Sequence, residues 1–278
     1  MKKVTALVSA LLSVLSLAGC ANSPKVENPY RIKTQIHETY HLDRTQTIRT
    51  EYIYDENGWL VETQTFKDND EWWYTTKFIL DENGNNHGSE TVAADGTQSV
   101  ERMLTLDDQG RMLTSESHQN GEVTATTEYG YNEAGQVTKL YINRLNALGG
   151  NDLKSFVDST YDSNGNLSRQ DIRWEPSNNQ EHTLYTYKND KIQRTETFAG
   201  DNLNCYSEYT YDETGLVQTA IERSVDETLQ SKHITTYDEY GNPLEVLAFA
   251  YVSEQARLGK AEDEPNTRTT NIYEEIGS

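Results

Sequence analysis

The chain has 278 residues, enough for one large domain or for an array of repeats, so its core does not depend on disulfides. Lys and Arg number 24 against 45 Asp and Glu, and the formal charge of −21 disfavours electrostatic binding to nucleic acid or to anionic lipid. Only 35% of the residues are apolar, although 18 are Tyr. Aliphatic residues are therefore too few for a densely packed α/β enzyme, and aromatic residues are too many for a disordered chain.

The first 19 residues have the pattern of an export signal. Lys2 and Lys3 precede an apolar run from Val4 to Leu17, which is too short for a membrane span. The sequence LAGC at residues 17–20 resembles the lipobox of bacterial lipoproteins. This resemblance implies cleavage before Cys20 and acylation of Cys20 with diacylglycerol and a palmitate-type chain. An ordinary signal peptide that happens to contain a cysteine is the alternative.

This pattern divides the chain into a signal peptide (residues 1–19), a lipidated Cys20 with a tether (20–29) and one β-repeat domain (30–278). Residues 21–29 contain Pro24, Pro29 and several Asn and Ser but no apolar periodicity, which is typical of a linker. We expect the domain to lie outside the cytoplasm, anchored by lipid to the cell membrane or the outer membrane. Ala21 rather than Asp after the cysteine would permit outer-membrane sorting, as the lipoprotein resemblance implies.

A possible zinc motif, HETYH, occupies residues 37–41. In zinc proteases a helix places both histidines of this pattern on one face. Here residues 31–42 alternate between polar and apolar types, which predicts a strand. On a strand His37 and His41 lie about 13 Å apart, too far to share one ion, so we predict no metal site.

A five-residue pattern ending in glycine recurs along the rest of the chain. It begins with YDENG at residues 54–58 and returns at 80–84, 106–110, 131–135, 161–165, 211–215 and 237–241, with degenerate copies at 187–190 and 273–277. Successive glycines are 25 or 26 residues apart wherever the unit is not lengthened. Such a period is typical of a repeat architecture.

Turn chemistry predicts what each unit builds. The Asp can accept hydrogen bonds from nearby backbone N–H groups, and the Gly tolerates the positive φ that completes a hairpin turn. Residues before each turn alternate, as in Thr50, Tyr52 and Tyr54, which predicts a strand. A second polar run follows each turn after about ten residues, so each period reads as two strands and two turns. We therefore predict an all-β fold, an antiparallel hairpin meander in a long twisted or coiled sheet.

The units resemble YD repeats, the Tyr-Asp-containing repeats of bacterial Rhs proteins and teneurins. The best copies are residues 121–137 and 161–167. The resemblance implies strips of antiparallel sheet that coil, and in large family members wind into a hollow shell. The units here are too few for a full shell, and the resemblance brings no catalytic residue.

Trp72, Trp73 and Tyr74 form the densest aromatic cluster and are the candidate binding residues. On a strand, alternation places Trp73 on the face opposite Trp72 and Tyr74, so one indole is exposed or covered by a ligand. Such a tryptophan can stack on a sugar ring or anchor a protein partner. The alternative is packing against a neighbouring hairpin, near Trp59.

Two units are longer than the rest, at Asn143 to Lys154 and at Glu254 to Asn266, and long loops on a rigid sheet often bind ligands.

Asp55 and Asp162 begin loops that resemble calcium sites, but a strand follows where the late glutamate ligand is needed. With Cys20 acylated, Cys205 has no disulfide partner and is expected to be a small strand residue.

The sequence therefore predicts an envelope lipoprotein whose β-repeat surface is a binding or scaffold module for protein or glycan. We expect no catalysis, no cofactor and no nucleic-acid partner, because no catalytic or nucleotide-binding motif is present. Two alternatives stay open. One is an immunity or accessory lipoprotein against a secreted toxin, since an acidic surface suits a basic partner. The other is a glycan-directed hydrolase, which the many carboxylates alone suggest.

Overall fold

A computed structural model describes residues 29–41, 44–96, 99–146, 150–251 and 264–276. In these ranges the chain is all-β, as predicted, and forms 18 strands. The strands are β1 (Tyr30–Tyr40), β2 (Thr45–Tyr54), β3 (Leu60–Lys67), β4 (Glu71–Leu80), β5 (Asn86–Ala93), β6 (Ser99–Leu106), β7 (Met112–Gln119), β8 (Glu122–Tyr131), β9 (Val137–Arg144), β10 (Leu153–Tyr161), β11 (Leu167–Glu175), β12 (Gln180–Lys188), β13 (Lys191–Ala199), β14 (Asn202–Tyr211), β15 (Val217–Ser224), β16 (Leu229–Tyr237), β17 (Pro243–Ala250) and β18 (Thr267–Glu275).

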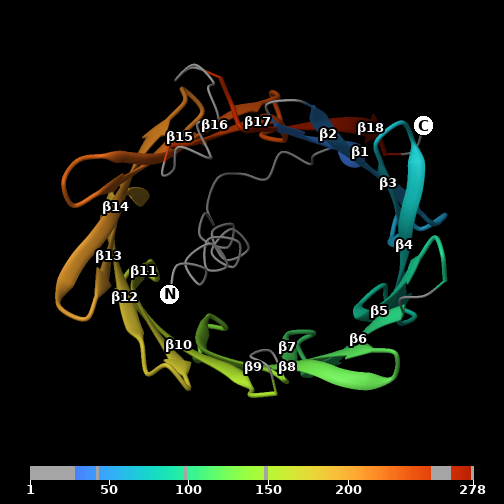
Figure 1. Ribbon diagram of the computed structural model, residues 1–278, viewed down its shortest axis with the longest axis horizontal. Coiled ribbons are helices and arrows are strands. Elements are labelled where there is room, and N and C mark those ends of the chain that lie inside the picture. Colours follow the sequence, from blue (N-terminus) through green and yellow to red (C-terminus); the bar gives the residue numbers. More distant parts are fainter. Residues whose placement is uncertain (1–28, 42–43, 97–98, 147–149, 252–263, 277–278) are drawn as a thin grey trace.

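The sheet is a closed antiparallel barrel. Each strand pairs with the next in sequence, and the last strand, β18, also pairs with β1, from Tyr30 opposite Glu275 to Thr39 opposite Thr267. Figure 1 shows the resulting ring, with β1 and β18 side by side. The prediction of an open twisted or coiled sheet is therefore wrong. Closure leaves neither of these strands as a free edge.

Repeated β-bulges bend the sheet. One follows almost every glycine turn, where the register shifts by one residue, for example between Ile53 and Tyr54 and between Thr160 and Tyr161. Each bulge adds twist and bend at the same end of the strands. Because a closed barrel is not a repeat strip, the interpretation of the chain as a YD-repeat, Rhs-like protein is wrong.

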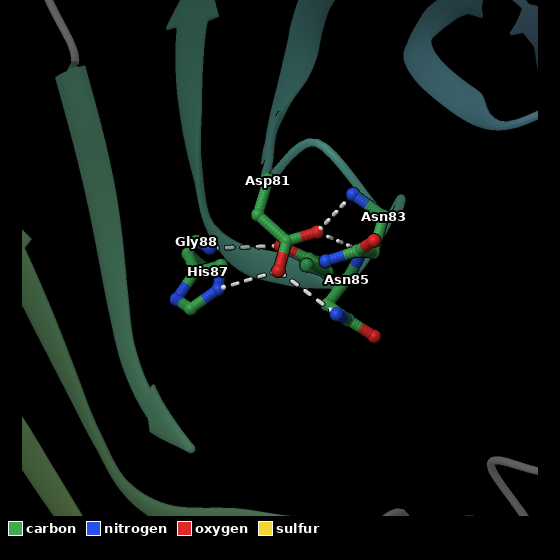
Figure 2. A network of polar contacts seen from close by, with 6 residues as sticks. Asp81, Asn83, Asn85, His87 and Gly88 are labelled. Atoms are coloured by element: carbon green, nitrogen blue, oxygen red, sulfur yellow. Dashed lines mark hydrogen bonds and ion pairs between the residues drawn. The ribbon is translucent and has the colours of Figure 1, made fainter. Parts of the chain in front are cut away.

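The glycine turns have the predicted chemistry. In the turn at Asp81, the backbone N–H of Gly84 donates to the carbonyl of Asp81 at 3.1 Å, and φ of Gly84 is +81°. One carboxylate oxygen of Asp81 accepts the N–H groups of Asn83 and Asn85, each at 2.8 Å, as Figure 2 shows. Its other oxygen accepts the side-chain amide of Asn85 at 2.8 Å and faces His87 Nε2 at 3.4 Å.

Neighbouring turns also contact one another around the rim. A Cβ placed on Gly84 would lie 2.5 Å from the ring of Trp59, which follows the preceding glycine turn. In several turns, the tyrosine that precedes the turn's Asp or Asn donates its hydroxyl to a backbone carbonyl near the start of the preceding strand. These pairs are Tyr54 with Ile32 at 2.8 Å, Tyr131 with Met112 at 2.7 Å, Tyr161 with Val137 at 2.8 Å, Tyr211 with Ile192, and Tyr237 with Val217 at 2.8 Å. Where the tyrosine is present, it thus ties a hairpin to the one before it.

One face of the sheet carries small hydroxyl residues and is closely packed. The cross-strand register puts the most buried polar side chains on this face, and they are Thr65, Ser115, Gln170, Thr183, Asn271 and Thr195. The same face carries the groups with the clearest signs of burial. Burial raises the pKa of Tyr185 to about 12 and lowers the pKa of His233.

Side chains converge on the concave side of a closed sheet and diverge on the convex side. The crowded hydroxyl face is therefore the inner wall of the barrel. The alternate residues form the outer wall, which carries charged and aromatic side chains. Arg194 is typical of the outer wall, because its guanidinium lies 3.8 Å from the ring centre of Tyr206 and its Nε donates to Glu196 at 3.1 Å.

Candidate functional site

The candidate site is a groove of about 820 Å³ on the outer wall between β8 and β13. Register pairs arrange its side chains in two rows that cross the strands. The aromatic row consists of Glu128, Tyr141, Phe156, Arg173 and Gln180, and the polar row consists of Gly130, Lys139, Asp158, Asp171 and His182. In Figure 1 these strands form the lower and left part of the ring.

The aromatic row is a packed stack. The rings of Tyr141 and Phe156 lie 4.9 Å apart at 34°, and the guanidinium of Arg173 lies 4.3 Å from the ring centre of Phe156. Both rings are half-buried, whereas Arg173 is exposed. Stacking of this kind fixes the orientation of both rings, with Phe156 held between Tyr141 and Arg173.

The polar row is fixed by a bidentate ion pair. Arg169 donates from Nε and Nη2 to the two carboxylate oxygens of Asp171, at 2.8 and 2.6 Å. These hydrogen bonds lower the pKa of Asp171 and raise that of Arg169, so both remain charged near neutral pH. Asp158 lies directly opposite both Asp171 and Lys139, which places one cation beside two carboxylates.

The two ends of the polar row have distinct shapes. His182 stacks on Phe198 with ring centres 4.7 Å apart and planes 5° apart, so one face of its imidazole is covered. At the other end Gly130 has no side chain, and a Cβ there would lie 3.2 Å from Cβ of Lys139. The stem of the Lys139 side chain therefore packs closely against the backbone of β8 at this point.

The groove combines flat apolar surface with fixed hydrogen-bonding groups. Carboxylates accept, the guanidinium and ammonium groups donate, and the imidazole can do either.

The structure separates the predicted aromatic cluster from this groove. Trp72 lies opposite Phe66 on the outer wall, and a bulge places Tyr74 opposite Thr65 on the inner wall. The expectation that Trp72 and Tyr74 share a face is therefore wrong, because the bulge interrupts the alternation. Trp72 is 45% exposed and Trp73 is 40% exposed. Both lie on β4, across the ring from β13 in Figure 1.

The other sequence-derived candidates are scattered. His37 lies in β1, as the predicted strand requires, and its Nδ1 is 2.9 Å from the hydroxyl of Thr269. Asp55 and Asp162 each accept backbone N–H groups of their own turns, as the turn prediction states. Cys20, the signal peptide and nearly all of the predicted tether lie outside the described residues, as does most of the long unit that begins at Glu254.

Cys205 is a strand residue on the inner wall. Burial, followed by the nearby charge of Glu222, raises the pKa of its thiol to about 11. Burial also raises the pKa of Glu222 itself. A thiol with so high a pKa is mostly protonated and weakly reactive at neutral pH.

Sequence reasoning missed the residues of the groove. Tyr141 and Phe156 flank the lengthened unit from Asn143 to Lys154, which was the available signal. Arg169, Asp171 and His182 carry no motif, and only the strand register brings them together.

Among the residues that the structure describes, no cluster of three or more His, Cys, Asp or Glu side chains is placed to hold a metal ion. In the same ranges, no helix is both long and apolar enough to cross a membrane.

No protein-family model matches the chain, and no curated protein matches it. Solved structures that are similar to this chain include a porin-like protein from Bacteroides uniformis. The two are 13% identical, the match covers 90% of this chain and 99% of that chain, and the TM-score is 0.45. A porin-like protein from Bacteroides vulgatus has 12% identity, 88% and 99% coverage, and a TM-score of 0.36. A chain of the TcdB2-TccC3-Cdc42 complex has 16% identity, 78% and 15% coverage, and a TM-score of 0.23. Identities and TM-scores this low do not transfer a function.

Proposed function

We propose that the protein is an envelope-associated β-barrel that works as a binding module. In this proposal lipid on Cys20 tethers it to a membrane, its outer wall faces water, and the groove between β8 and β13 holds the ligand. The export signal and the lipobox resemblance support the location. The charge of the outer wall is the observation that supports the other part of the proposal, a barrel whose outer wall faces water.

The outer wall is unsuited to contact with lipid tails. Arg49, Arg169, Arg194 and Arg268 all lie on it, each in an ion pair with a neighbouring acidic residue. A barrel wall inside a bilayer carries an apolar band, and each Arg or Lys at its midplane costs about 2–4 kcal/mol. Four arginines on different strands, with their partner carboxylates, interrupt such an apolar band and favour a barrel that stands in water beside the membrane.

The test is membrane retention of the full chain in a bacterial host. We expect the wild type to sediment with membranes, to resist a high-salt wash and to dissolve in detergent. Cys20→Ser should release the protein in soluble, folded form, because the lipid is its anchor. Cys205→Ser is the matched control and should stay with the membrane.

Two results would contradict this proposal. One is that Cys20→Ser remains in the membrane and resists extraction by alkaline carbonate, which would indicate an inserted wall. The other is stable ion conductance when the purified protein is added to a planar lipid bilayer.

A further inference from the structure

We propose that the groove between β8 and β13 binds a carbohydrate, an uncharged oligosaccharide that lies across the strands. This rests on the proposed function and names its ligand class. The aromatic row and the polar row run side by side across five strands, β8 to β12, which is the shape that an extended chain of sugar rings requires.

The aromatic row supplies stacking surface. A pyranose ring has one face of C–H groups, and this face packs on flat aromatic surface. The Phe156 ring stacks against Tyr141, with ring centres 4.9 Å apart at 34°, so Phe156 holds Tyr141 in place, and the opposite face of Tyr141 is the stacking surface of this proposal. Arg173 holds the Phe156 ring from one side at 4.3 Å, so little side-chain freedom is lost when a ligand stacks.

The polar row supplies planar hydrogen-bonding groups at the edge of the sugar. The Arg169–Asp171 pair is locked by two hydrogen bonds of 2.8 and 2.6 Å, and each partner keeps further donor or acceptor positions free for vicinal hydroxyl groups. Asp158 and Lys139 add an acceptor and a donor in the same row. Hydroxyl groups can both donate and accept, so they match a row that contains both kinds of partner.

Charge argues for an uncharged ligand. The polar row, together with Arg169 that is paired to it, mixes two cations with Asp158 and Asp171, so it presents no field of a single sign. An anionic polymer would meet the two carboxylates, and a cationic one would meet Arg169, Arg173 and Lys139. The volume of about 820 Å³ lies in the usual range of small-ligand sites, and a peptide docked by strand addition would need a free sheet edge that the groove lacks.

The test is calorimetric titration of the full-length Cys20→Ser protein with soluble, uncharged oligosaccharides. The panel contains oligomers of glucose, mannose, galactose and N-acetylglucosamine. We expect at least one to bind with a Kd between about 1 µM and 1 mM, the weak range usual for solvent-exposed sites. A charged oligosaccharide of the same length and a random-coil peptide serve as comparison ligands.

A matched pair of variants locates the site. Phe156→Ala removes the groove ring under Arg173, and Phe66→Ala removes an outer-wall ring that lies 4.2 Å under Arg49 in the same way. Phe156→Ala should weaken binding at least tenfold, Phe66→Ala less than twofold, and Phe156→Tyr should restore it. Asp158→Asn, at an exposed position, should weaken binding at least threefold without loss of folding.

Three outcomes would overturn the inference. They are no binding to any oligosaccharide of the panel, binding of the peptide alone, and binding that Trp72→Ala abolishes while Phe156→Ala leaves it unchanged. Each of these can occur while Cys20→Ser still releases the protein from membranes, so failure of the ligand and failure of the tether are distinguishable.

Discussion

The inner and outer walls of the barrel come from the same strands and differ in almost every physical property. On β3, Thr65 faces inward and is 1% exposed, while its neighbour Gln64 faces outward and bonds to Glu62. Alternate residues therefore experience crowding on one side and water on the other. The inner wall is the more closely packed of the two, and this makes it the more sensitive to substitution.

Thr65→Arg should produce the largest loss of stability. A guanidinium has no room and no partner there, so we expect the free energy of unfolding to drop by about 4 kcal/mol, or the chain to fold only partly. The adjacent Gln64→Arg, beside Glu62 and Glu51, should change it by less than about 0.5 kcal/mol. Urea unfolding followed by circular dichroism measures both. Equal effects would mean that the walls are wrongly assigned.

Gly84→Ala tests the contact between neighbouring turns. The substitution forces an alanine into positive φ and drives its Cβ to 2.5 Å from Trp59, so we expect a loss of about 2–3 kcal/mol. Gly96→Ala is the control, because Gly96 has φ of +70° and a Cβ placed there would meet nothing within 4 Å; it should lose only about 1 kcal/mol. If the two variants unfold at the same temperature, the turns do not support one another.

Tyr161→Phe tests the tyrosine that joins adjacent hairpins. It removes the hydroxyl that donates to the carbonyl of Val137 at 2.8 Å, and a buried hydrogen bond of this kind contributes about 1 kcal/mol. Tyr240→Phe, at a 37% exposed ring in a turn, should be neutral. Thermal unfolding of both proteins checks this. A neutral Tyr161→Phe would show that the Tyr-Asp pair acts through the aspartate alone.

The pH dependence should have opposite signs at the rim and on the inner wall. Hydrogen bonds, first from the Asn85 side chain, lower the pKa of Asp81 from 3.8 to about 2. Its stabilisation is thus complete above pH 4 and is lost as the pH falls toward 2. Burial raises the pKa of Glu222 above 4.5, so stability falls as the pH rises through that raised value.

Two neutral variants separate these effects. Asp81→Asn should remove part of the acid-induced loss of stability, and Glu222→Gln should make the protein more stable than the wild type at pH 7. Urea midpoints between pH 2.5 and 8 measure both. A destabilised Glu222→Gln at pH 7 would contradict the burial of that carboxyl.

The sequence predicted the local structure well and the closure poorly. Asp81 and Gly84 fix a turn through bonds within five residues, so a short window contains all the information. Closure depends on bulges such as the one between Thr65 and Phe66, whose bending adds up over many hairpins. No single repeat unit shows this accumulated bend. A bulge is also the reason why alternation predicted the wrong faces for Trp72 and Tyr74.

The groove was beyond sequence reasoning because it consists of register pairs. Asp158, Asp171 and His182 come from three strands and become neighbours only when each hairpin has its observed pairing. A shift of one residue in β11 would turn Asp171 inward and expose Gln170 instead. The lengthened unit next to Tyr141 marked the region but not the residues.

Thiol reactivity tests the assignment of the two walls most directly. The full chain with Cys20→Ser keeps one native thiol, Cys205 on the inner wall, and Thr210→Cys adds one on the exposed outer wall of the same strand. With a bulky maleimide at pH 7.5, the outer thiol should react about 100-fold faster or more, because burial raises the pKa of Cys205 to about 11. Equal rates in the folded protein would contradict the account.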